Sequence, residues 1–330
     1  AIISYLTGLD YSQDDIHSFS RDYFIPLAII AVMSSLSLGQ LRAIGWKPIF
    51  LFAGGSVFIA IFPVLFAFLD TNFVTNTLLN EGYWKGIPPI VGSWIGGSTS
   101  QLVLKEIVAC PEDIFLSVLV MDNILVNIWT ILMFQFIKGS NLINRKLKIT
   151  DLGIPENLRP NPLKSIPSWS VIVILLGIVI LTNLWVESFI AKVILLSLIG
   201  LAISNIWPRW NFKFALRSGA VLILIVMAVL GLKLQFATLG FNPEFLIFLI
   251  VWLIGHFVFM MIIAKMLNLN MAWVPIASMA NVGGIATAPA VTAAYENKWM
   301  PHAVVLAILS MATGTFWGVL TIYLLENFLV

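Results

Sequence analysis

One acidic residue lies inside an otherwise apolar segment, in "SVLVMDNILVNIWTILMF". Asp122 is followed directly by Asn123, and Asn127 lies one helical turn after Asn123. An acid at bilayer depth costs at least about 2.5 kcal/mol on insertion scales, so it marks a functional site by default. A buried carboxyl group can exchange H⁺ for Na⁺. The pattern predicts an ion-coupling site at these three residues; the alternative is a protonated Asp hydrogen-bonded inside a helix bundle.

A second titratable group lies in "VWLIGHFVFMM", where His256 completes the predicted ion-coupling set. Histidine titrates in the physiological range, so a proton relay is one interpretation. A neutral imidazole hydrogen-bonded to a neighbouring helix is the other. Lys105, Glu106 and His302 lie nearer the ends of their apolar segments, and we expect them to be interfacial and solvated.

Two apolar segments, "GSWIGGSTSQLVLKEI" and "MANVGGIATAPAVTAA", each contain a Gly-Gly pair followed by hydroxyl residues. Glycine costs about 1 kcal/mol and proline about 3 kcal/mol relative to alanine inside a helix, so both helices should be interrupted. Interrupted helices in the two halves of a chain point to a transporter site. The predicted substrate-binding residues are Gly96, Gly97, Ser98, Thr99, Ser100, Gln101, Asn281, Gly283, Gly284, Thr287 and Pro289.

A broken helix presents two half-helix ends near the midplane, a positive one suited to a carboxylate and a negative one suited to a cation. Unwound backbone at that depth is tolerated only where it is buried in protein or lines a watered cavity. The alternative is close helix packing, because Gly92 with Gly96 and Gly314 with Gly318 are small-xxx-small patterns.

The elements that would position these residues follow from composition. The chain is 60% hydrophobic and 10% charged, which indicates an all-α polytopic membrane protein. The apolar N-terminal stretch 1–9 is too short to span, and we interpret it as the tail of an incomplete helix. Ten spans are predicted: Tyr23–Leu41, Pro48–Leu69, Ile87–Ala109, Ile114–Ile137, Val171–Val186, Phe189–Ile206, Phe214–Leu232, Phe245–Leu267, Ala272–Ala294 and His302–Leu325.

A polar loop at 138–168 divides the chain into a first transmembrane half, 1–137, and a second, 169–330. The loop has six Lys or Arg against Asp151 and Glu156, so the positive-inside rule predicts that it is cytoplasmic. Arg42 and Lys47 also favour the cytoplasm, yet three predicted spans separate them from the loop. The absolute orientation therefore stays open.

The two halves resemble each other in their order of helix, polar turn, helix and interrupted segment. An inverted repeat requires an even number of spans between equivalent helices, whereas five predicted spans separate the interrupted segments. Either the stretch 171–206 contains one span fewer, or the long loop hides a re-entrant segment.

Several classes of function lack support in the sequence. There is no His-Glu-x-x-His zinc pair, P-loop or Gly-x-Ser-x-Gly elbow, so we expect no enzyme and no cofactor except H⁺ or Na⁺ as coupling ion, with Na⁺ near Asp122 as the one conceivable metal. The lone Cys110 cannot form an intramolecular disulfide. A net charge of +2 argues against nucleic acid as a partner.

The stretches "IGGSTSQLVLKEI", "MDN" and "ANVGGIATAPAVTAA" resemble an uncharacterised bacterial and plastid membrane-protein family, which looks related to the superfamily of cation:proton antiporters and bile acid:sodium symporters. The resemblance covers nearly the whole chain. It implies a panel or dimerisation domain and a core domain in which Ile87–Ala109 and Ala272–Ala294 cross near the midplane. Asp122 and Asn123 match the ion-site pair of the antiporters in reversed order, and His256 or Lys265 would stand for their lysine.

These observations predict an ion-coupled secondary transporter of a small anionic organic solute, working by alternating access in the bacterial inner membrane. A monovalent cation/proton antiporter, and a channel or scaffold subunit that does not transport, are the alternatives. Membrane lipid and a small solute are the expected partners, within a homodimer or a hetero-complex.

Overall fold

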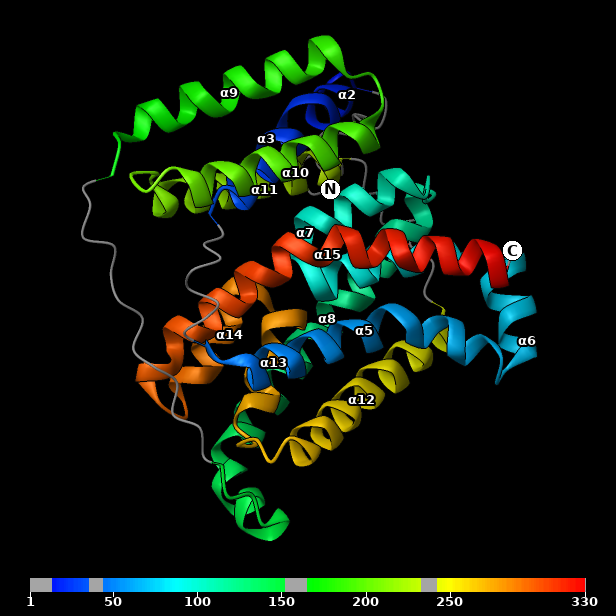
Figure 1. Cartoon of the computed structure of the whole chain (residues 1–330). Coiled ribbons are helices and arrows are strands. Elements are labelled where there is room, and N and C mark those ends of the chain that lie inside the picture. Colours follow the sequence, from blue (N-terminus) through cyan, green and yellow to red (C-terminus); the bar gives the residue numbers. More distant parts are fainter. Residues whose placement is uncertain (1–13, 36–43, 152–164, 233–241, 330) are drawn as a thin grey trace. The chain divides into compact units, whose positions relative to one another are not determined.

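A computed structural model describes residues 14–35, 44–151, 165–232 and 242–329 (Figure 1). These ranges are almost entirely helical, and every predicted span overlaps a helix. The N-terminal stretch 1–9, Arg42 and residues 152–164 of the long loop lie outside them. Six of the described helices are long and apolar enough to cross a membrane, as expected for a multi-pass membrane protein: Trp46–Ala67, Glu112–Leu147, Ser168–Trp185, Phe189–Ile206, Pro243–Met266 and Met300–Phe328.

The helices form two compact units, and each draws on both sequence halves. The first unit comprises 1–37, 111–117 and 160–240; the second comprises 38–110, 118–159 and 241–330. The helix Glu112–Leu147 begins in the first and continues through the second. This helix also covers the first ten residues of the polar loop predicted at 138–168, so the non-helical stretch begins later than predicted.

The first unit is built around a fully buried short helix, α3, whose nine residues are all apolar or proline. Gly200 of α10 and Gly219 of α11 pack directly against it, with Met33 and Val32 as their nearest neighbours. The outer helix α9 exposes Trp169 and other large apolar side chains, as a lipid-facing helix does. The elements are α2 (Ile16–Phe19), η1 (Ser20–Phe24), α3 (Ile25–Met33), α9 (Ser168–Trp185), α10 (Phe189–Ile206) and α11 (Phe212–Leu232).

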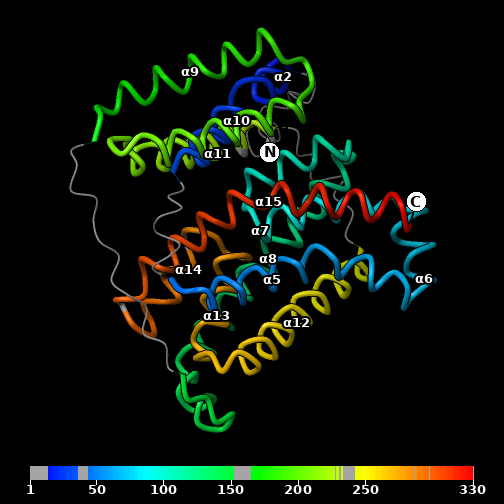
Figure 2. Tube along the Cα trace, in the orientation of Figure 1, coloured from blue at the N-terminus to red at the C-terminus, as the bar shows by residue number. Residues whose placement is uncertain are grey.

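The second unit, called the core below, contains both interrupted segments. Its helices α5, α12 and α15 run along a common direction (Figure 2), and aromatic rings of α5 and α12 stack along their contact, for example Phe58 on Phe259. The elements are α5 (Trp46–Ala67), α6 (Thr71–Phe73), η3 (Val74–Asn80), η4 (Tyr83–Gly86), α7 (Ile87–Ile107), α8 (Glu112–Leu147), α12 (Pro243–Met266), α13 (Trp273–Val282), α14 (Gly284–Ala293), η6 (Asn297–Trp299) and α15 (Met300–Phe328).

The first interrupted segment, α7, folds back on itself at Gly97. A Cβ atom built on Gly92 would lie 2.8 Å from the Gln101 backbone nitrogen, whereas nine residues of continuous helix would separate these positions by about 13 Å. At the base, Lys85 Nζ donates a hydrogen bond to the Ala109 carbonyl at 3.5 Å. The segment is therefore a re-entrant hairpin with arms 87–96 and 98–107, and the prediction that it crosses the membrane as a broken helix was wrong.

The second interrupted segment is also a hairpin, formed by α13 and α14. Gly284 has a φ of 67°, and Gly97 at the first tip has a φ of 69°. At the base, Asn270 Nδ2 donates to the Tyr295 hydroxyl at 3.1 Å, and the rings of Trp273 and Trp299 stack 5.0 Å apart. The segment thus ends where it began, and its predicted crossing of the core was likewise wrong.

The two hairpins enter the core from opposite ends. Tyr83, at the base of the first, packs 4.8 Å from Phe245 at the start of α12. Asn270, at the base of the second, follows the end of α12 and accepts a hydrogen bond from Asn144 near the end of α8 at 2.8 Å. Neither hairpin crosses the core. The order helix, hairpin, helix in α5, α7 and α8 therefore recurs in α12, α13–α14 and α15, with each element of the second set running in the opposite direction to its counterpart. The odd span count is thereby explained without either alternative offered by the sequence.

The same topology removes the conflict between the basic segments. Lys47 at the start of α5 forms an ion pair with Asp151, just after α8, at 2.6 Å. Two crossings, α5 and α8, separate these residues along the chain, so both lie at one end of the core. This basic end also holds Lys138 and Lys298, whereas Asp70 and Glu244 lie together at the acidic end.

We therefore expect the basic end of the core to face the cytoplasm. Single cysteines can test this in a Cys110→Ala background, since Cys110 is buried. A cysteine at Lys298 should react with a membrane-impermeant maleimide only in inverted vesicles, and one at Asn76 only in right-side-out vesicles. The reverse labelling pattern would mean that the acidic end faces the cytoplasm. Labelling of both cysteines from the same side would contradict the entry of the two hairpins from opposite ends.

Candidate functional site

The two hairpin tips meet at α15. Ser310 Oγ donates a hydrogen bond to the carbonyl of Ile95, just before the first tip. It also lies 3.2 Å from Asn281 Oδ1, just before the second. A Cβ atom on Gly96 would lie 2.9 Å from the Gly314 Cα atom. Since Gly314 is the middle residue of α15 (Met300–Phe328), the tips meet at half the depth of the core.

Asp122 joins the two arms of the first hairpin. Its side chain, only 3% exposed, accepts hydrogen bonds from Ser93 Oγ at 2.5 Å and Trp94 Nε1 at 2.7 Å, both on the outgoing arm. On the returning arm, Gln101 Nε2 lies 3.3 Å from the same carboxylate. The carboxylate therefore acts as a bracket across the hairpin, close to its tip.

The hydrogen bonds to Asp122 depend on its protonation state. A carboxylate accepts all three donors, but a proton on Oδ2 would have to point toward an acceptor. The Ser93 hydroxyl can reverse its direction, whereas the Trp94 N–H is a donor only. Proton binding or release at Asp122 must therefore reverse the direction of the Ser93 hydrogen bond, one of the contacts that hold the hairpin at this carboxyl group.

The asparagines predicted beside Asp122 lie elsewhere. Asn123 and Asn127 are exposed, and their amides donate to the α8 backbone at Leu119 and Asn123, at 2.7 and 2.8 Å. Successive residues of a helix point in different directions, so a neighbour in sequence does not share a face. The structure therefore does not bring these two residues to the carboxylate, contrary to the expectation that the three residues form one site.

His256 is fully buried beside the second hairpin. A Cβ atom on Gly55 would lie 2.9 Å from His256 Cε1 and 3.2 Å from Asn281 Nδ2, which places both side chains at one point on α5. Neither ring nitrogen makes a hydrogen bond of ordinary geometry within the described ranges, although the Gly55 backbone lies close. The hydrogen bonds that Asp122 accepts come from Ser93, Trp94 and Gln101, and not from His256. The two titratable groups predicted as one set thus occupy separate positions in the core.

Asn281 holds the second tip against its neighbours. Besides its contact with Ser310, it accepts a hydrogen bond from Ser56 Oγ at 3.1 Å and donates one to the Phe52 carbonyl at 3.4 Å. Both partners belong to α5. The outgoing arm of the second hairpin is therefore fixed to α5 and α15 by a single buried amide.

Each returning arm carries, in its first turn, a hydroxyl that has no partner among the described residues. Thr99 Oγ1, on a residue only 7% exposed, and Thr287 Oγ1 are both buried without a hydrogen bond in this part of the chain. By contrast, the hydroxyl of Ser100, the residue after Thr99, accepts a hydrogen bond from the Thr315 hydroxyl at 3.2 Å. The first N–H groups of a helix also lack intrahelical partners and carry partial positive charge. Each tip can therefore donate hydrogen bonds to an anionic group.

The remaining predicted residues form or flank the turns. Gly97, Ser98, Gly283 and Gly284 are half-buried at the tips. Pro289 lies within the returning arm α14.

Gly97→Ala should destabilise the protein by about 1–3 kcal/mol, because a φ of 69° with a ψ of −169° is accessible essentially to glycine alone. A Cβ atom there would touch nothing within 4 Å, so the cost is purely one of backbone conformation. Gly139→Ala is the matched control: it is equally uncrowded but helical, and should gain about 0.5–1 kcal/mol. Thermal melts in detergent would show the difference, and equal shifts would refute the assigned turn.

Residues 5–153 and 165–328 match the family described as Protein of unknown function (DUF819). The chain belongs to this family. No curated protein and no solved structure matches it.

The DUF819 match includes both hairpins and every core helix, so the site lies wholly within the family's own sequence. The uncharacterised family suggested by the sequence motifs is thus confirmed, while its relation to the antiporter and symporter superfamily stays a prediction.

Sequence reasoning missed several residues of the DUF819 core. Ser93, Trp94, Ser56 and Ser310 contact the predicted site but were not singled out. A single serine in an apolar helix is common and carries no distinguishing signal. Lys105 and His302, expected to be solvated, are 5% and 1% exposed.

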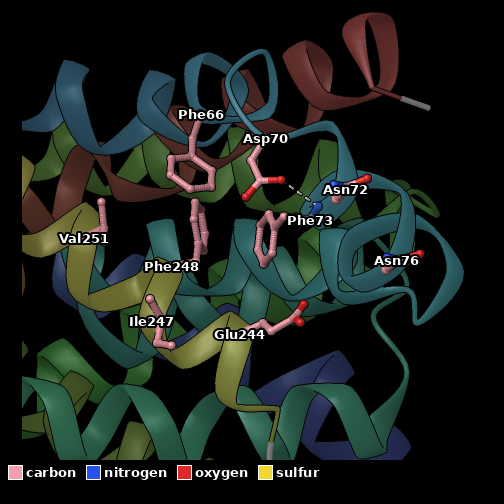
Figure 3. Close-up of a pocket in the computed structure, with 9 residues that line it drawn as sticks. All are labelled: Phe66, Asp70, Asn72, Phe73, Asn76, Glu244, Ile247, Phe248 and Val251. Carbon is pink, nitrogen blue, oxygen red and sulfur yellow. Dashed lines mark hydrogen bonds between the residues drawn. The ribbon is translucent and has the colours of Figure 1, made fainter.

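A separate cavity of about 360 Å³ opens at the acidic end of the core (Figure 3). Phe66, Phe73 and Phe248 form its wall, and Asp70 and Glu244 lie at its rim. Both carboxylates already have partners: Asp70 accepts from the Phe73 backbone at 3.0 Å, and Glu244 from Thr77 at 2.7 Å. No predicted site residue lines this cavity, so it is not the site at the hairpin tips. Among the described residues, His, Cys, Asp and Glu form no group of three that could hold a metal ion.

Proposed function

We propose that this DUF819 protein is an ion-coupled secondary transporter that carries a small anionic organic solute across the bacterial inner membrane by alternating access. One observation carries the proposal: two re-entrant hairpins enter from opposite ends and meet at the middle of α15, where Ser310 contacts both. A helix bundle that only anchors a complex has no need of such interruptions. Each hairpin costs regular helical hydrogen bonds at a depth where water cannot replace them.

The inverted repeat supports alternating access. Each hairpin separates the meeting point from one end of the core, so displacing one hairpin would expose the point to one side only. In an inverted repeat, each half can adopt the conformation of the other half, which gives an inward-facing and an outward-facing state of similar energy. Transport in both directions through one central site follows from this symmetry.

The chemistry of the tips supports an anionic solute and a coupling cation. The returning arms begin near the meeting point with unsatisfied N–H groups, and within the described residues the buried Thr99 and Thr287 hydroxyls have no hydrogen-bond partner, so both kinds of group are available to a carboxylate. Asp122 would bind H⁺ or Na⁺, and its occupancy would alter the bracket between the arms of the first hairpin. Ion binding and hairpin movement would thereby be coupled.

The resemblance to cation:proton antiporters and bile acid:sodium symporters points the same way. Their sites lie where two interrupted segments meet in a core domain, next to an acidic residue on the following helix. Asp122 on α8, the helix after the first hairpin, has the corresponding position. Re-entrant hairpins in place of crossing helices are the difference in this chain.

The thermal stability of the purified protein in Na⁺, Li⁺, K⁺ and choline, across a range of pH, is the first test. A ligand at 100 times its Kd stabilises a two-state protein by about 2.7 kcal/mol, which is readily measured. We expect one small cation or H⁺ to raise the melting temperature above the choline control. The same ion gradient should drive uptake of radiolabelled carboxylates into proteoliposomes.

Two other outcomes would redirect the proposal. Cation-driven proton flux in the absence of any solute would identify a cation/proton antiporter. If neither an ion-dependent shift nor any ion-driven flux is found, the transporter proposal fails and a scaffold role is favoured.

A further inference from the structure

We propose that the solute is a monocarboxylate with an apolar body, its carboxylate held at the first hairpin tip and its body at the second. This inference rests on the transport function proposed above and specifies its substrate class. It comes from two features of the tips: an unequal distribution of polar side chains, and the lack of Lys or Arg in the described segments that form and receive the tips.

The first tip is polar. Ser98, Thr99 and Ser100 follow Gly97 directly and open the returning arm 98–107. The Thr99 hydroxyl is the decisive group, because it is buried, lies in the first turn of the arm and has no hydrogen-bond partner in the described ranges. A carboxylate oxygen at the start of this arm could accept from both the hydroxyl and the unsatisfied N–H groups.

The second tip is mostly apolar. After Gly284 the returning arm continues with Ile285, Ala286, Thr287, Ala288 and Pro289, so one hydroxyl stands among aliphatic residues. The Asn281 amide before the tip is already occupied by Ser56, Ser310 and the Phe52 carbonyl. By its sequence, this tip therefore offers aliphatic side chains and a single hydroxyl, that of Thr287, to a bound solute.

The charge available at the tips matches one anion. No Lys or Arg occurs between Lys85 and Lys105, between Lys265 and Lys298, or in α15, so the hairpin arms and α15 bring no cationic side chain to the meeting point. The positive potential must come from the two returning helices, each equivalent to about half a charge at its N-terminus. Together they compensate about one negative charge, and a second carboxylate would be left unpaired near Asp122.

Binding of three probes of similar size separates charge from shape: 3-methylbutanoate, butanedioate and 3-methylbutanamide. Each is titrated against the wild-type protein by thermal shift, with the coupling cation or pH at saturation. We expect 3-methylbutanoate to bind at least about ten-fold more tightly than the dianion or the neutral amide, the range for a hydrogen bond to a charged group. Uptake into proteoliposomes should follow the same order.

Variants at the tips locate the two ends of the solute. Thr99→Val should weaken 3-methylbutanoate binding about ten-fold or more, while Thr99→Ser retains it. Thr130→Val is the matched control, because the Thr130 hydroxyl bonds only its own helix, at the Val126 carbonyl. Ile285→Ser should shift the preference toward butanedioate and away from the branched monocarboxylate.

The possible failures are distinguishable. If butanedioate binds as tightly as 3-methylbutanoate, or Thr99→Val leaves the preference unchanged, the substrate class is wrong while transport of anions still stands. If no carboxylate of either kind binds or is taken up under any ion gradient, both this inference and the proposed function are overturned.

Discussion

Asp122→Asn is expected to reduce ion-coupled uptake to the level of protein-free liposomes while the protein remains folded. A carboxamide cannot gain or lose a proton, and it is a weaker ligand for Na⁺ than a carboxylate. Its oxygen can still accept the Trp94 N–H, and its amino group can donate to Ser93 and to the oxygen of a reversed Gln101 amide, so the bracket across the first hairpin survives in neutral form. The cation- or pH-dependent thermal shift should disappear along with uptake.

Asp122→Ala should behave differently, because it leaves the Ser93, Trp94 and Gln101 donors without an acceptor. Each buried unsatisfied group costs about 1–3 kcal/mol, so we expect a loss of several kcal/mol and poor yields of folded protein. Asp70→Asn is the control acid, since Asp70 caps a short helix at the acidic end and should leave coupling intact. Coupled uptake by Asp122→Asn at the wild-type rate would exclude this residue as the coupling group.

Gly314→Ala is expected to be the most damaging substitution of a glycine in the core. The added Cβ atom would overlap the Gly96 backbone, both its nitrogen and its Cα atom. Backbone cannot move aside as a side chain can, so the first hairpin would have to separate from α15. Overpacking of this kind costs about 1–3 kcal/mol or more, and the displaced tip should also abolish uptake.

Gly318→Ala, one turn further along α15, supplies the comparison. Its Cβ atom would meet the Leu104 side chain, which can change rotamer. We therefore expect a smaller loss of stability and partial retention of uptake in this variant. Wild-type melting and uptake by Gly314→Ala would show that the first hairpin does not rest on α15 as described.

The spans could be predicted because hydropathy reports burial in lipid directly. The hairpins could not, because a stretch of 21 residues such as α7 is long enough to cross once or to enter and return. Which of the two occurs depends on the backbone conformation of Gly97 and on contacts such as Gly92 against Gln101, and neither leaves a linear pattern. Two inconsistencies in the sequence could have indicated hairpins: the odd number of spans between the interrupted segments, and the three predicted spans that put Lys47 on the opposite side from the basic loop.

The site was predictable in part for similar reasons. Asp122 stands out because an acid in an apolar helix is costly, and the glycine pairs stand out because they interrupt helices. Asn123 was included because it follows Asp122 in the sequence, but successive residues of a helix lie on different faces, and its side chain bonds the backbone of α8 instead. Ser310 contacts Ile95 across 215 positions of chain, a distance that no local pattern encodes.

That long separation also bears on how the protein is made. About 200 residues are synthesised between Gly96 and Gly314, so at roughly 5–20 residues per second the first hairpin waits about 10–40 s for the helix that receives its tip. Its unwound turn cannot remain in lipid unaided during that interval. Nascent chains halted before α15 should therefore keep the first hairpin at the membrane surface or in the insertion machinery, where a protease can still cleave it.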